Sequence, residues 1–526
     1  MAARDLSLLW HYVRKWAREK PDAEALVSLN ERLTWAGFAE QVDRVAKAFI
    51  EIGVQKGDGV ALISMARNEF LTTFMAASKI GAMWLGLSPK STVEEVGYML
   101  RDFRPRVIVT LGDYLGKGLV CAGLTMVNAI PGRKKILTLG EGAEGADDFT
   151  EFVNRPRPDL DAALDQRAAE VEPDDSVLVM YTSGSTGKPK GVVHCHKGII
   201  ANVAFEIREF ALEGNARVLL HFPINHVAAD VEIGFAAIYA GATIVSRERF
   251  DPKLSLQAVE REGITLVGQV PAMYLFQMRH PAFRDAGLSS VKTFVISGAT
   301  PSKALVDALA VLCKKTGARL VNAFGMTETA GLVTYTRTGD PPEVILASAG
   351  RPGDPFEVRI VDEDRREVPD GKIGEIAIRG EPVMKGYLND PEATAEVMDA
   401  DGWFYTHDLA KKDINGYLYI VGRKSEMFKS GGENVFPREV ESILESHPAV
   451  AAVAVIGVPD EIYDEVGRAF VVLKPGSAVT EPELRAFCQI HLSNFKVPKH
   501  IEFRAELPML PNGRIDKKAL KAENER

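Results

Sequence analysis

The stretch Met180-Tyr-Thr-Ser-Gly-Ser-Thr-Gly-Lys-Pro-Lys-Gly-Val-Val-His-Cys-His196 begins at the end of an apolar run, Val177–Met180. A short apolar run followed by glycine-rich sequence predicts a buried strand and then a loop. The residues after the run are glycines, hydroxyl side chains and lysines: Gly184, Gly187, Gly191, Thr182, Ser183, Ser185, Thr186, Lys188 and Lys190. Glycines let backbone N–H groups approach an anion closely, and hydroxyl and ammonium groups add donors and charge. The stretch therefore predicts a phosphate-binding loop, with a flexible surface turn as the alternative.

This loop differs from the two commonest phosphate-binding motifs. Pro189 stands where a Walker A loop requires glycine, and the G-x-G-x-x-G fingerprint is absent. From Thr182 to Gly191 the loop instead resembles, without a gap, the phosphate loop of the adenylate-forming enzymes. That superfamily contains acyl-CoA synthetases, peptide-synthetase adenylation domains and beetle luciferases. The resemblance implies that the loop holds the β- and γ-phosphates of ATP, with Thr182 and Lys190 among the catalytic residues.

A second motif, Asn322-Ala-Phe-Gly-Met-Thr-Glu-Thr329, follows a strand candidate. An aromatic ring, a glycine, a hydroxyl and a carboxylate at the end of a parallel strand are the groups needed to stack a base, approach a phosphate and hold a hard cation. A core aromatic followed by a helix cap is the alternative. The motif is similar to the superfamily's Y-G-x-T-E pattern. The resemblance implies that Phe324 stacks on adenine, that Thr327 contacts the α-phosphate and that Glu328, with Thr182, binds Mg²⁺. It also implies nucleotide contacts from Asn322, Gly325, Met326, Gly298 and Ala299.

A third group consists of Gly402-Trp-Phe-Tyr-Thr-His-Asp408 and, fifteen residues later, Arg423. A carboxylate and a guanidinium can bind the two ribose hydroxyls, one as acceptor and the other as donor. A surface salt bridge in a turn is the alternative. The segment resembles the W-x-x-T-G-D pattern, with His407 in place of glycine. The resemblance implies that Asp408 and Arg423 bind the ribose.

Further matches at 374–394 and 422–441 occur in the superfamily's order, and the resemblance covers about residues 20 to 520. It implies an α/β fold: a large N-terminal domain (1–424) of two α/β sheets plus a distorted β-barrel, and a small mobile α+β C-terminal domain (425–526). It also places Gly431 and Gly432 beside the tunnel for the pantetheine arm of CoA.

The order of helix-like and strand-like segments along the chain agrees with this fold. Apolar helix-like and strand-like segments alternate from Glu24 to about Val109, which predicts a βαβ arrangement. Short alternating strands between Gly350 and Gly422 favour an antiparallel, barrel-like subdomain, and a compact α+β pattern follows. Further strands are expected at Val218–Phe222, Ala242–Val245, Thr265–Val267, Thr293–Ile296, Arg319–Val321, Ala451–Ile456, Ala469–Leu473 and His500–Phe503.

Two further departures from the superfamily matter for the chemistry. The C-terminal motif P-x-G-K reads Pro511-Asn-Gly-Arg514, so arginine stands where a lysine is implied to bridge the substrate carboxylate and the α-phosphate. Arginine keeps the charge but spreads it over a planar fork. The hinge position, commonly Asp or Lys, is Ser425. A small residue can absorb backbone rotation.

The segment Phe222-Pro-Ile-Asn-His226 resembles the part of the superfamily that forms the mouth of the acyl pocket. His226, Val270, Ser297 and Gly298 are therefore expected to surround the acid, although a single histidine beside an apolar run is more often structural. Asp230 and Glu232 follow closely. We interpret them as charges on the surface of a helix, with recognition of a polar or cationic substrate tail as the alternative.

Length and composition limit the number of domains, the kinds of partner and the location of the protein. A chain of 526 residues is longer than a domain with a single hydrophobic core usually is, so two or more domains are expected. A net charge of −9 gives no reason to expect nucleic-acid binding. The N-terminus lacks a secretory signal, no apolar stretch is suited to span a bilayer, and the four cysteines are scattered. We expect a cytoplasmic protein without integral membrane contact, and leave a homodimer open.

The motifs together indicate an ATP- and Mg²⁺-dependent carboxylic acid–CoA ligase. It would form an acyl-AMP intermediate, release AMP and pyrophosphate, and act on a medium-chain aliphatic or aromatic acid. Two alternatives stay open: a stand-alone adenylation enzyme that loads a carrier protein, and a non-catalytic nucleotide-binding relative, which Arg514 motivates.

Overall fold

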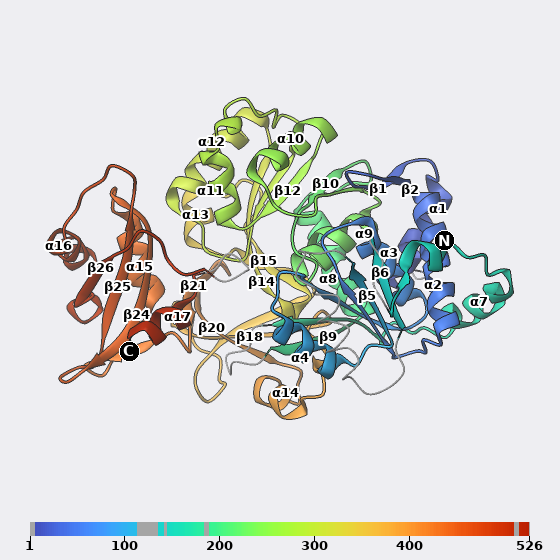
Figure 1. Cartoon of the computed structure of the whole chain (residues 1–526). Coiled ribbons are helices and arrows are strands. Elements are labelled where there is room, and N and C mark those ends of the chain that lie inside the picture. The colour runs from blue at the N-terminus through green and yellow to red at the C-terminus, as the bar shows by residue number, and fades with distance from the viewer. Residues whose placement is uncertain (1–5, 113–134, 141–144, 183–188, 510–514, 525–526) are drawn as a thin grey trace.

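The computed structural model describes residues 6–112, 135–140, 145–182, 189–509 and 515–524, and Figure 1 shows their arrangement. Two large mixed sheets carry the N-terminal three quarters of the chain, and helices cover them (Figure 1). The predicted α/β class is confirmed.

The first large sheet has nine strands in the order β16-β15-β14-β13-β12-β10-β11-β1-β2. In this order they are Arg351–Pro352, Gly331–Tyr335, Arg319–Met326, Thr293–Ile296, Leu266–Gln269, Arg217–Leu220, Thr243–Ser246, Glu24–Val27 and Arg32–Thr34. The central strands are parallel and read as nearly continuous apolar runs, because helices cover both faces of such a sheet. The prediction for Thr293–Ile296 is exact, and the others in this sheet are confirmed with bounds that differ at one or both ends.

The second large sheet has eight strands in the order β19-β9-β8-β4-β3-β5-β6-β7. They are Gly386–Tyr387, Lys190–Cys195, Ser176–Thr182, Met83–Leu87, Gly59–Ile63, Val107–Leu111, Lys135–Leu139 and Asp147–Asp148. The strand predicted at Val177–Met180 is β8, and β9 returns antiparallel to it on the far side of the predicted phosphate loop. This hairpin therefore holds both ends of the loop in fixed positions.

The helices of this large region connect the strands and cover the two sheets. They are α1 Leu9–Glu19, α2 Trp35–Ile52, α3 Asn68–Lys79, α4 Val93–Phe103, α6 Phe149–Asn154, α7 Asp161–Ala169, α8 His196–Glu209, α9 Ala236–Ala240, α10 Pro252–Glu262, α11 Pro271–Arg279, α12 Lys303–Thr316, α13 Pro342–Ala347 and α14 Pro391–Val397. A π-helical segment, η4 (Ala228–Phe235), precedes α9, and all eight of its residues are buried. It lies in the main core, which joins side chains from both large sheets.

An antiparallel four-stranded sheet stands where the barrel-like subdomain is predicted. Its strands, in the order in which they pair, are β17 Phe356–Val361, β18 Gly374–Gly380, β20 Phe404–Lys412 and β21 Leu418–Arg423. At its border Gly350 accepts a hydrogen bond from the backbone N–H of Leu418 at 2.9 Å. Gly350 has a φ of +84°, and a Cβ there would lie 1.9 Å from the carbonyl carbon of Tyr335. Only glycine fits so close to the backbone of β15.

Replacing Gly350 with alanine is therefore expected to destabilise the fold by roughly 3 kcal/mol or more, because the methyl group overlaps backbone that cannot move aside. Chemical denaturation measures this loss. Gly339→Ala is the matched control: Gly339 also has a positive φ, +93°, but nothing lies within 4 Å of its Cβ position. The control isolates the conformational cost, about 1 kcal/mol. Equal losses in the two variants would contradict the clash.

The C-terminal residues form a separate α+β unit, drawn in orange and red at one side of Figure 1. Its strands are β22 Phe428–Ser430, β23 Glu433–Val435, β24 Val450–Asp460, β25 Asp464–Leu473 and β26 His500–Phe503, and its helices are α15 Pro437–Ser446, α16 Glu481–His491 and α17 Lys517–Asn524. Its apolar core contains residues from Phe428 onward. α15 begins at Pro437, and Thr480 and Glu483 form a capping box at the start of α16. The domain boundary between residues 424 and 425 stays a prediction.

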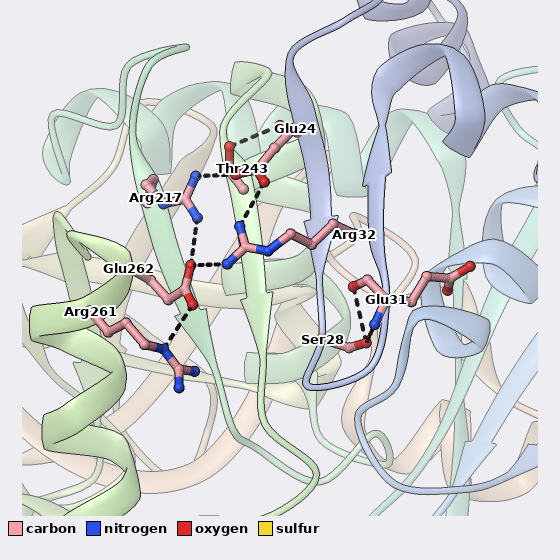
Figure 2. A network of polar contacts seen from close by, with 8 residues as sticks. All are labelled: Glu24, Ser28, Glu31, Arg32, Arg217, Thr243, Arg261 and Glu262. Carbon is pink, nitrogen blue, oxygen red and sulfur yellow. Dashed lines mark hydrogen bonds and ion pairs between the residues drawn. The ribbon is translucent and has the colours of Figure 1, made fainter.

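Figure 2 shows a charged network that joins the β1–β2 hairpin to β10 and α10. The buried carboxylate of Glu262 accepts from Arg32 and Arg217 at 2.7 and 3.0 Å. The same two guanidinium groups bind Glu24 at 2.6 and 2.8 Å. Glu24 has two cationic partners and Glu262 has three, because Arg261 also binds it. The pKa values of both carboxylates therefore lie below the ordinary range despite partial burial. The network is structural, and its charges are compensated internally.

Candidate active site

The carboxyl ends of three neighbouring parallel strands meet at one edge of the nine-stranded sheet. The register pairs Gln269 of β12 with Ile296 of β13, and Ile296 with Asn322 of β14. Val270 and Ser297 follow directly after their strands, so these predicted pocket residues lie side by side. A Cβ on Gly298 would lie 3.2 Å from the Val270 side chain, which places Gly298 in the same group. Ligands of open α/β sheets bind at this kind of edge.

The β14–β15 hairpin forms the centre of the site. Between the two strands a short 3₁₀ turn, Thr327–Thr329, presents Glu328. Gly325 is required here, because a Cβ at this position would lie 2.2 Å from the carbonyl oxygen of Gly331. The buried ring of His194, in β9, donates from Nε2 to the carbonyl oxygen of Thr327 at 2.7 Å. Burial lowers the pKa of His194 to about 4, so the ring is neutral and holds the turn against the second sheet.

The Glu328 carboxylate has a polar partner from a distant part of the sequence. Tyr387 donates its hydroxyl proton to Oε1 of Glu328 at 3.2 Å. The ammonium group of Lys190 lies 5.0 Å from the centre of the Tyr387 ring, which joins the end of the predicted phosphate loop to the same group. Burial raises the pKa of Glu328 above its ordinary value, while Tyr387 and the positive charge of Arg423 act in the opposite direction. A nearby cation would therefore stabilise the ionised carboxylate.

The predicted ribose pair is adjacent in the structure. Asp408 of β20 pairs in register with Arg423 of β21, and Arg423 Nε lies 3.2 Å from Asp408 Oδ1. Asp408 is buried, whereas the Arg423 side chain is about half exposed, at 52%. His407 has a φ of +61°, which explains why the superfamily has glycine there. Its backbone N–H donates to Glu375 Oε1 at 2.9 Å, which supports this unfavourable conformation.

Two residues predicted to contact the nucleotide, Phe324 and Asn322, differ in how far they are buried. Phe324 is half-buried and packs against the core of the four-stranded sheet, so part of its ring remains accessible. Asn322 is buried, and its amide group donates to the carbonyl oxygens of Ile345 and Ser348 at 3.0 and 2.9 Å. The Asn322 side chain thus holds neighbouring backbone in place. Ala299, Met326 and Thr327 lie at the same edge, on or next to β13 and β14.

The segment around His226 is where the structure overturns one interpretation. His226 Nδ1 accepts from the backbone N–H of Ala228 at 3.2 Å, and its ring stacks on Phe222. Asp230 and Glu232 are not on a helix surface: they are 0% and 8% exposed, in η4. The interpretation as surface charges is therefore wrong, because η4 lies inside the core between the two large sheets and has no face toward water.

Two comparisons of the sequence identify the family. Residues 13–388 match the model of the AMP-binding enzyme family, and residues 439–514 match the model of its C-terminal domain. The chain belongs to the AMP-binding enzyme family. The resemblance to adenylate-forming enzymes seen in the motifs is thereby confirmed.

Relatives of this AMP-binding enzyme extend over nearly its whole length. A feruloyl-CoA synthase from an Amycolatopsis species is 37% identical, with 95% of each chain covered. A crotonobetaine/carnitine–CoA ligase from Citrobacter koseri is 33% identical, with 93% of each chain covered. The crystal structure of the anthranilate CoA ligase AuaEII in complex with anthranoyl-AMP superposes with a TM-score of 0.88 at 26% identity and covers 99% of each chain. The predicted class, an AMP-forming acyl-CoA synthetase, is confirmed.

Several predicted residues of this AMP-binding enzyme lie outside the residues that the structure describes. They are Ser183, Gly184, Ser185, Thr186, Gly187 and Arg514. Thr182 and Lys190, which flank the loop, pair across β8 and β9. Gly431 and Gly432 form the turn of the β22–β23 hairpin with φ values of +60° and +85°, a two-residue turn that favours glycine at both positions. Within the described part of the chain, each helix is too short or too polar to cross a bilayer.

Sequence reasoning missed two residues of the site, His194 and Tyr387. Tyr387 lies inside a stretch that resembles the family and His194 lies just after one, but their roles depend on contacts between segments far apart in sequence. Tyr387 reaches Glu328 because β19 pairs with β9 beside the β14–β15 hairpin.

Proposed function

We propose that this acyl-CoA synthetase acts in two steps at the edge formed by β12, β13 and β14. In the first step an oxygen of the substrate carboxylate attacks the α-phosphorus of ATP, and pyrophosphate leaves. In the second step the thiol of CoA attacks the carbonyl carbon of the acyl-AMP, and AMP leaves as the thioester forms. A free carboxylate is a poor electrophile because it would have to expel oxide, whereas AMP is a good leaving group.

The observation that supports this proposal is the convergence of three groups from distant parts of the chain. Lys190 and Thr182 end the predicted phosphate loop, Glu328 and Tyr387 stand at the turn after β14, and Asp408 with Arg423 lies on the neighbouring sheet. Arg423 and Asp408 are close enough to Glu328 to influence the pKa of its carboxyl group. The triphosphate, the reacting phosphorus and the ribose of one ATP would thus each have a partner. Catalysis of such a displacement is chiefly positioning and charge neutralisation.

Mg²⁺ fits the donors that are present. Magnesium in nucleotide enzymes is commonly held by one or two carboxylates while substrate phosphates and water supply the other ligands. Glu328 supplies one carboxylate, and the Thr182 hydroxyl is a second oxygen ligand in this proposal. Among the described residues, no group of three or more His, Cys, Asp or Glu side chains is arranged to hold a metal. We therefore propose that Glu328 holds Mg²⁺ together with the phosphates, where the ion would neutralise charge on pyrophosphate.

The second step is assigned to the C-terminal domain. We propose that Gly431 and Gly432, in the exposed turn of the β22–β23 hairpin, lie along the pantetheine arm of CoA. Glycines at a tight turn leave room for a narrow chain to pass. Rotation about Ser425, at the start of the C-terminal domain, would exchange the residues facing the acyl-AMP between the two steps.

The acid is proposed to be a medium-chain aliphatic or an aromatic one, bounded by His226, Val270, Ser297 and Gly298. The relatives are named for feruloyl, crotonobetaine or carnitine, and anthranilate substrates, so their names do not agree on one acid. Loading of a carrier protein and loss of catalysis remain alternatives. Cytoplasmic location and a homodimer stay predictions.

The experiment is mass-spectrometric detection of acyl-AMP and acyl-CoA with ATP and Mg²⁺, across short, medium, aromatic and cationic acids, with and without CoA. We expect a thioester only when CoA is present. Acyl-AMP that accumulates in the presence of CoA would favour a carrier protein as acceptor. The absence of both products with every acid would favour the non-catalytic alternative.

A further inference from the structure

Three polar side chains with unused hydrogen-bonding capacity meet behind the catalytic turn. They are Asn202 and Glu206 of α8 and Glu232 of η4. Asn202 and Glu206 are 0% exposed, and both Glu206 carboxylate oxygens and Asn202 Oδ1 have no hydrogen-bond partner. Glu232 keeps 8% exposure. Buried polar groups are nearly always paired, so unpaired ones call for a ligand, an ion or a water molecule.

These side chains lie directly against the strand that leaves the catalytic turn. A Cβ on Gly331, three residues after Glu328, would lie 3.1 Å from Glu232 Cγ and 3.2 Å from Asn202 Nδ2. Asn202 Nδ2 donates to the carbonyl oxygens of Thr329 and Ala330 at 3.2 and 3.0 Å, which fixes its Oδ1 in place. Glu206 lies one helical turn after Asn202 on the same face of α8, and α8 packs against both η4 and β15.

Glu232 is also close to the predicted acyl pocket. The neighbouring side chain of Ile233 lies 3.3 Å from the Cβ position of Gly268, two residues before Val270. η4 therefore contacts β12, which leads into the pocket, through Ile233, and the start of β15, which leaves the catalytic turn, through Glu232. A substrate tail that reaches Glu232 would extend along η4 from the pocket.

The hydrogen-bonding chemistry of Asn202, Glu206 and Glu232 indicates which kind of substrate tail they can bind. Asn202 Oδ1 is an acceptor, and each carboxylate, when ionised, only accepts. Three convergent acceptors match the three N–H donors of a primary ammonium group, and two carboxylates supply the charge that a buried cation requires.

We propose that Glu232, Glu206 and Asn202 form a subsite that binds a primary ammonium group at the far end of the carboxylic acid. The inference rests on the proposed ligase function and narrows its substrate to an acid with a terminal amine. Gly331 is part of this subsite, since any side chain there would press against Glu232.

The raised pKa values of the two glutamates make binding of an ammonium group at this subsite depend on pH. Burial raises the pKa of Glu232 to about 8, and burial together with the Glu232 charge raises the pKa of Glu206 well above its ordinary value. The other titratable groups near them are Tyr335 of β15 and Glu209 of α8, which is paired with Arg337. Below pH 8 the Glu232 carboxyl holds a proton that an ammonium group must displace, so binding of the ammonium group strengthens as pH rises toward 8.

The test compares pyrophosphate release with ω-amino acids, ω-hydroxy acids and plain alkanoic acids of equal length, and with aminomethyl and methyl aromatic acids. We expect the ammonium acids to be preferred in kcat/KM by about 10²-fold, because a site built for a polar group rejects the analogue that lacks it. The ratio of kcat/KM for the ammonium acid to that for its neutral analogue should rise from pH 6 to pH 8. Glu232→Gln should bring the ratio close to one and remove its pH dependence, and Glu206→Gln should lower it.

Asp230→Asn is the matched control. Asp230 is equally buried in η4 and also lacks partners for its carboxylate, but burial alone raises its pKa, without a nearby charge. The control should leave the ratio unchanged. Equal use of neutral and ammonium acids by the wild type, or a preference that survives in Glu232→Gln and disappears in Asp230→Asn, would overturn the inference while the ligase function stands.

Calorimetric titration with ω-amino acids, including 6-aminohexanoate, separates the two proposals when no acid yields pyrophosphate. Binding that Glu232→Gln abolishes would support the subsite and refute the ligase. No binding together with no pyrophosphate would refute both.

Discussion

Replacing Glu328 with glutamine is expected to lower pyrophosphate release by about 10²- to 10³-fold with every acid, since the amide removes the charge proposed to hold Mg²⁺ at the phosphates. Glutamine preserves the shape of the side chain and can still accept from Tyr387, so the turn after β14 should keep its conformation. The Mg²⁺ concentration that gives half-maximal rate should rise. Steady-state release of pyrophosphate, measured across a Mg²⁺ titration, tests both expectations.

Glu381→Gln is the control for the Glu328 variant, because Glu381 is an exposed carboxylate just after β18 and its loss changes the same net charge. It should behave as the wild type. A Glu328→Gln enzyme with nearly normal rate and unchanged Mg²⁺ dependence would mean that the metal is held elsewhere. A loss of rate without a change in Mg²⁺ dependence would instead assign Glu328 a purely structural role.

Much of the site could be predicted because its groups stand at the ends of strands. The apolar run before Thr182 and the exact strand Thr293–Ile296 show that buried parallel strands have a clear sequence signature. The pairing of Asp408 with Arg423 follows from two antiparallel strands joined by a short connection, which brings residues fifteen apart into register. Local patterns and family motifs therefore carry these features.

The features that were missed depend on tertiary context. Charged residues in a helix are rarely buried, so Asp230 and Glu232 read as surface charges. They are buried because η4 is enclosed by side chains of both sheets, and the sequence contains no sign that this segment is π-helical. Likewise, Tyr387 contacts a carboxylate 59 residues away through a pairing of β19 with β9. The pattern of apolar and polar residues within one segment cannot predict contacts with distant segments.

Arg514 gives the second large effect, although it lies outside the described residues. Three positions after it, the chain is anchored: Lys517, at the start of α17, binds Glu426 and Glu441 at 2.7 Å each. This fastens the end of the C-terminal motif close to the Ser425 hinge. A cation at position 514 would therefore move with the C-terminal domain, as the proposed two-step mechanism requires.

Arg514→Ala is expected to lower the formation of acyl-AMP by about 10²-fold or more, because the variant loses the positive charge proposed between the carboxylate and the α-phosphate. Conversion of synthetic acyl-AMP and CoA to thioester should change little, since the residue is proposed to leave the site before that step. Lys518→Ala, an exposed lysine in the same segment, is the control and should preserve both half-reactions. The two half-reactions are measured separately, by release of pyrophosphate and by appearance of thioester.

The Arg514→Lys variant then tests whether Arg514 takes part in catalysis or whether the protein is a non-catalytic relative. A planar guanidinium and a compact ammonium place their charge differently, so the lysine variant should form acyl-AMP at a rate different from the wild type while remaining active. An inactive wild type that gains activity in Arg514→Lys would identify the chain as a non-catalytic relative whose ATP groups are otherwise intact. Equal loss of both half-reactions in Arg514→Ala would mean that the residue supports the C-terminal domain as a whole and does not act in the first step alone.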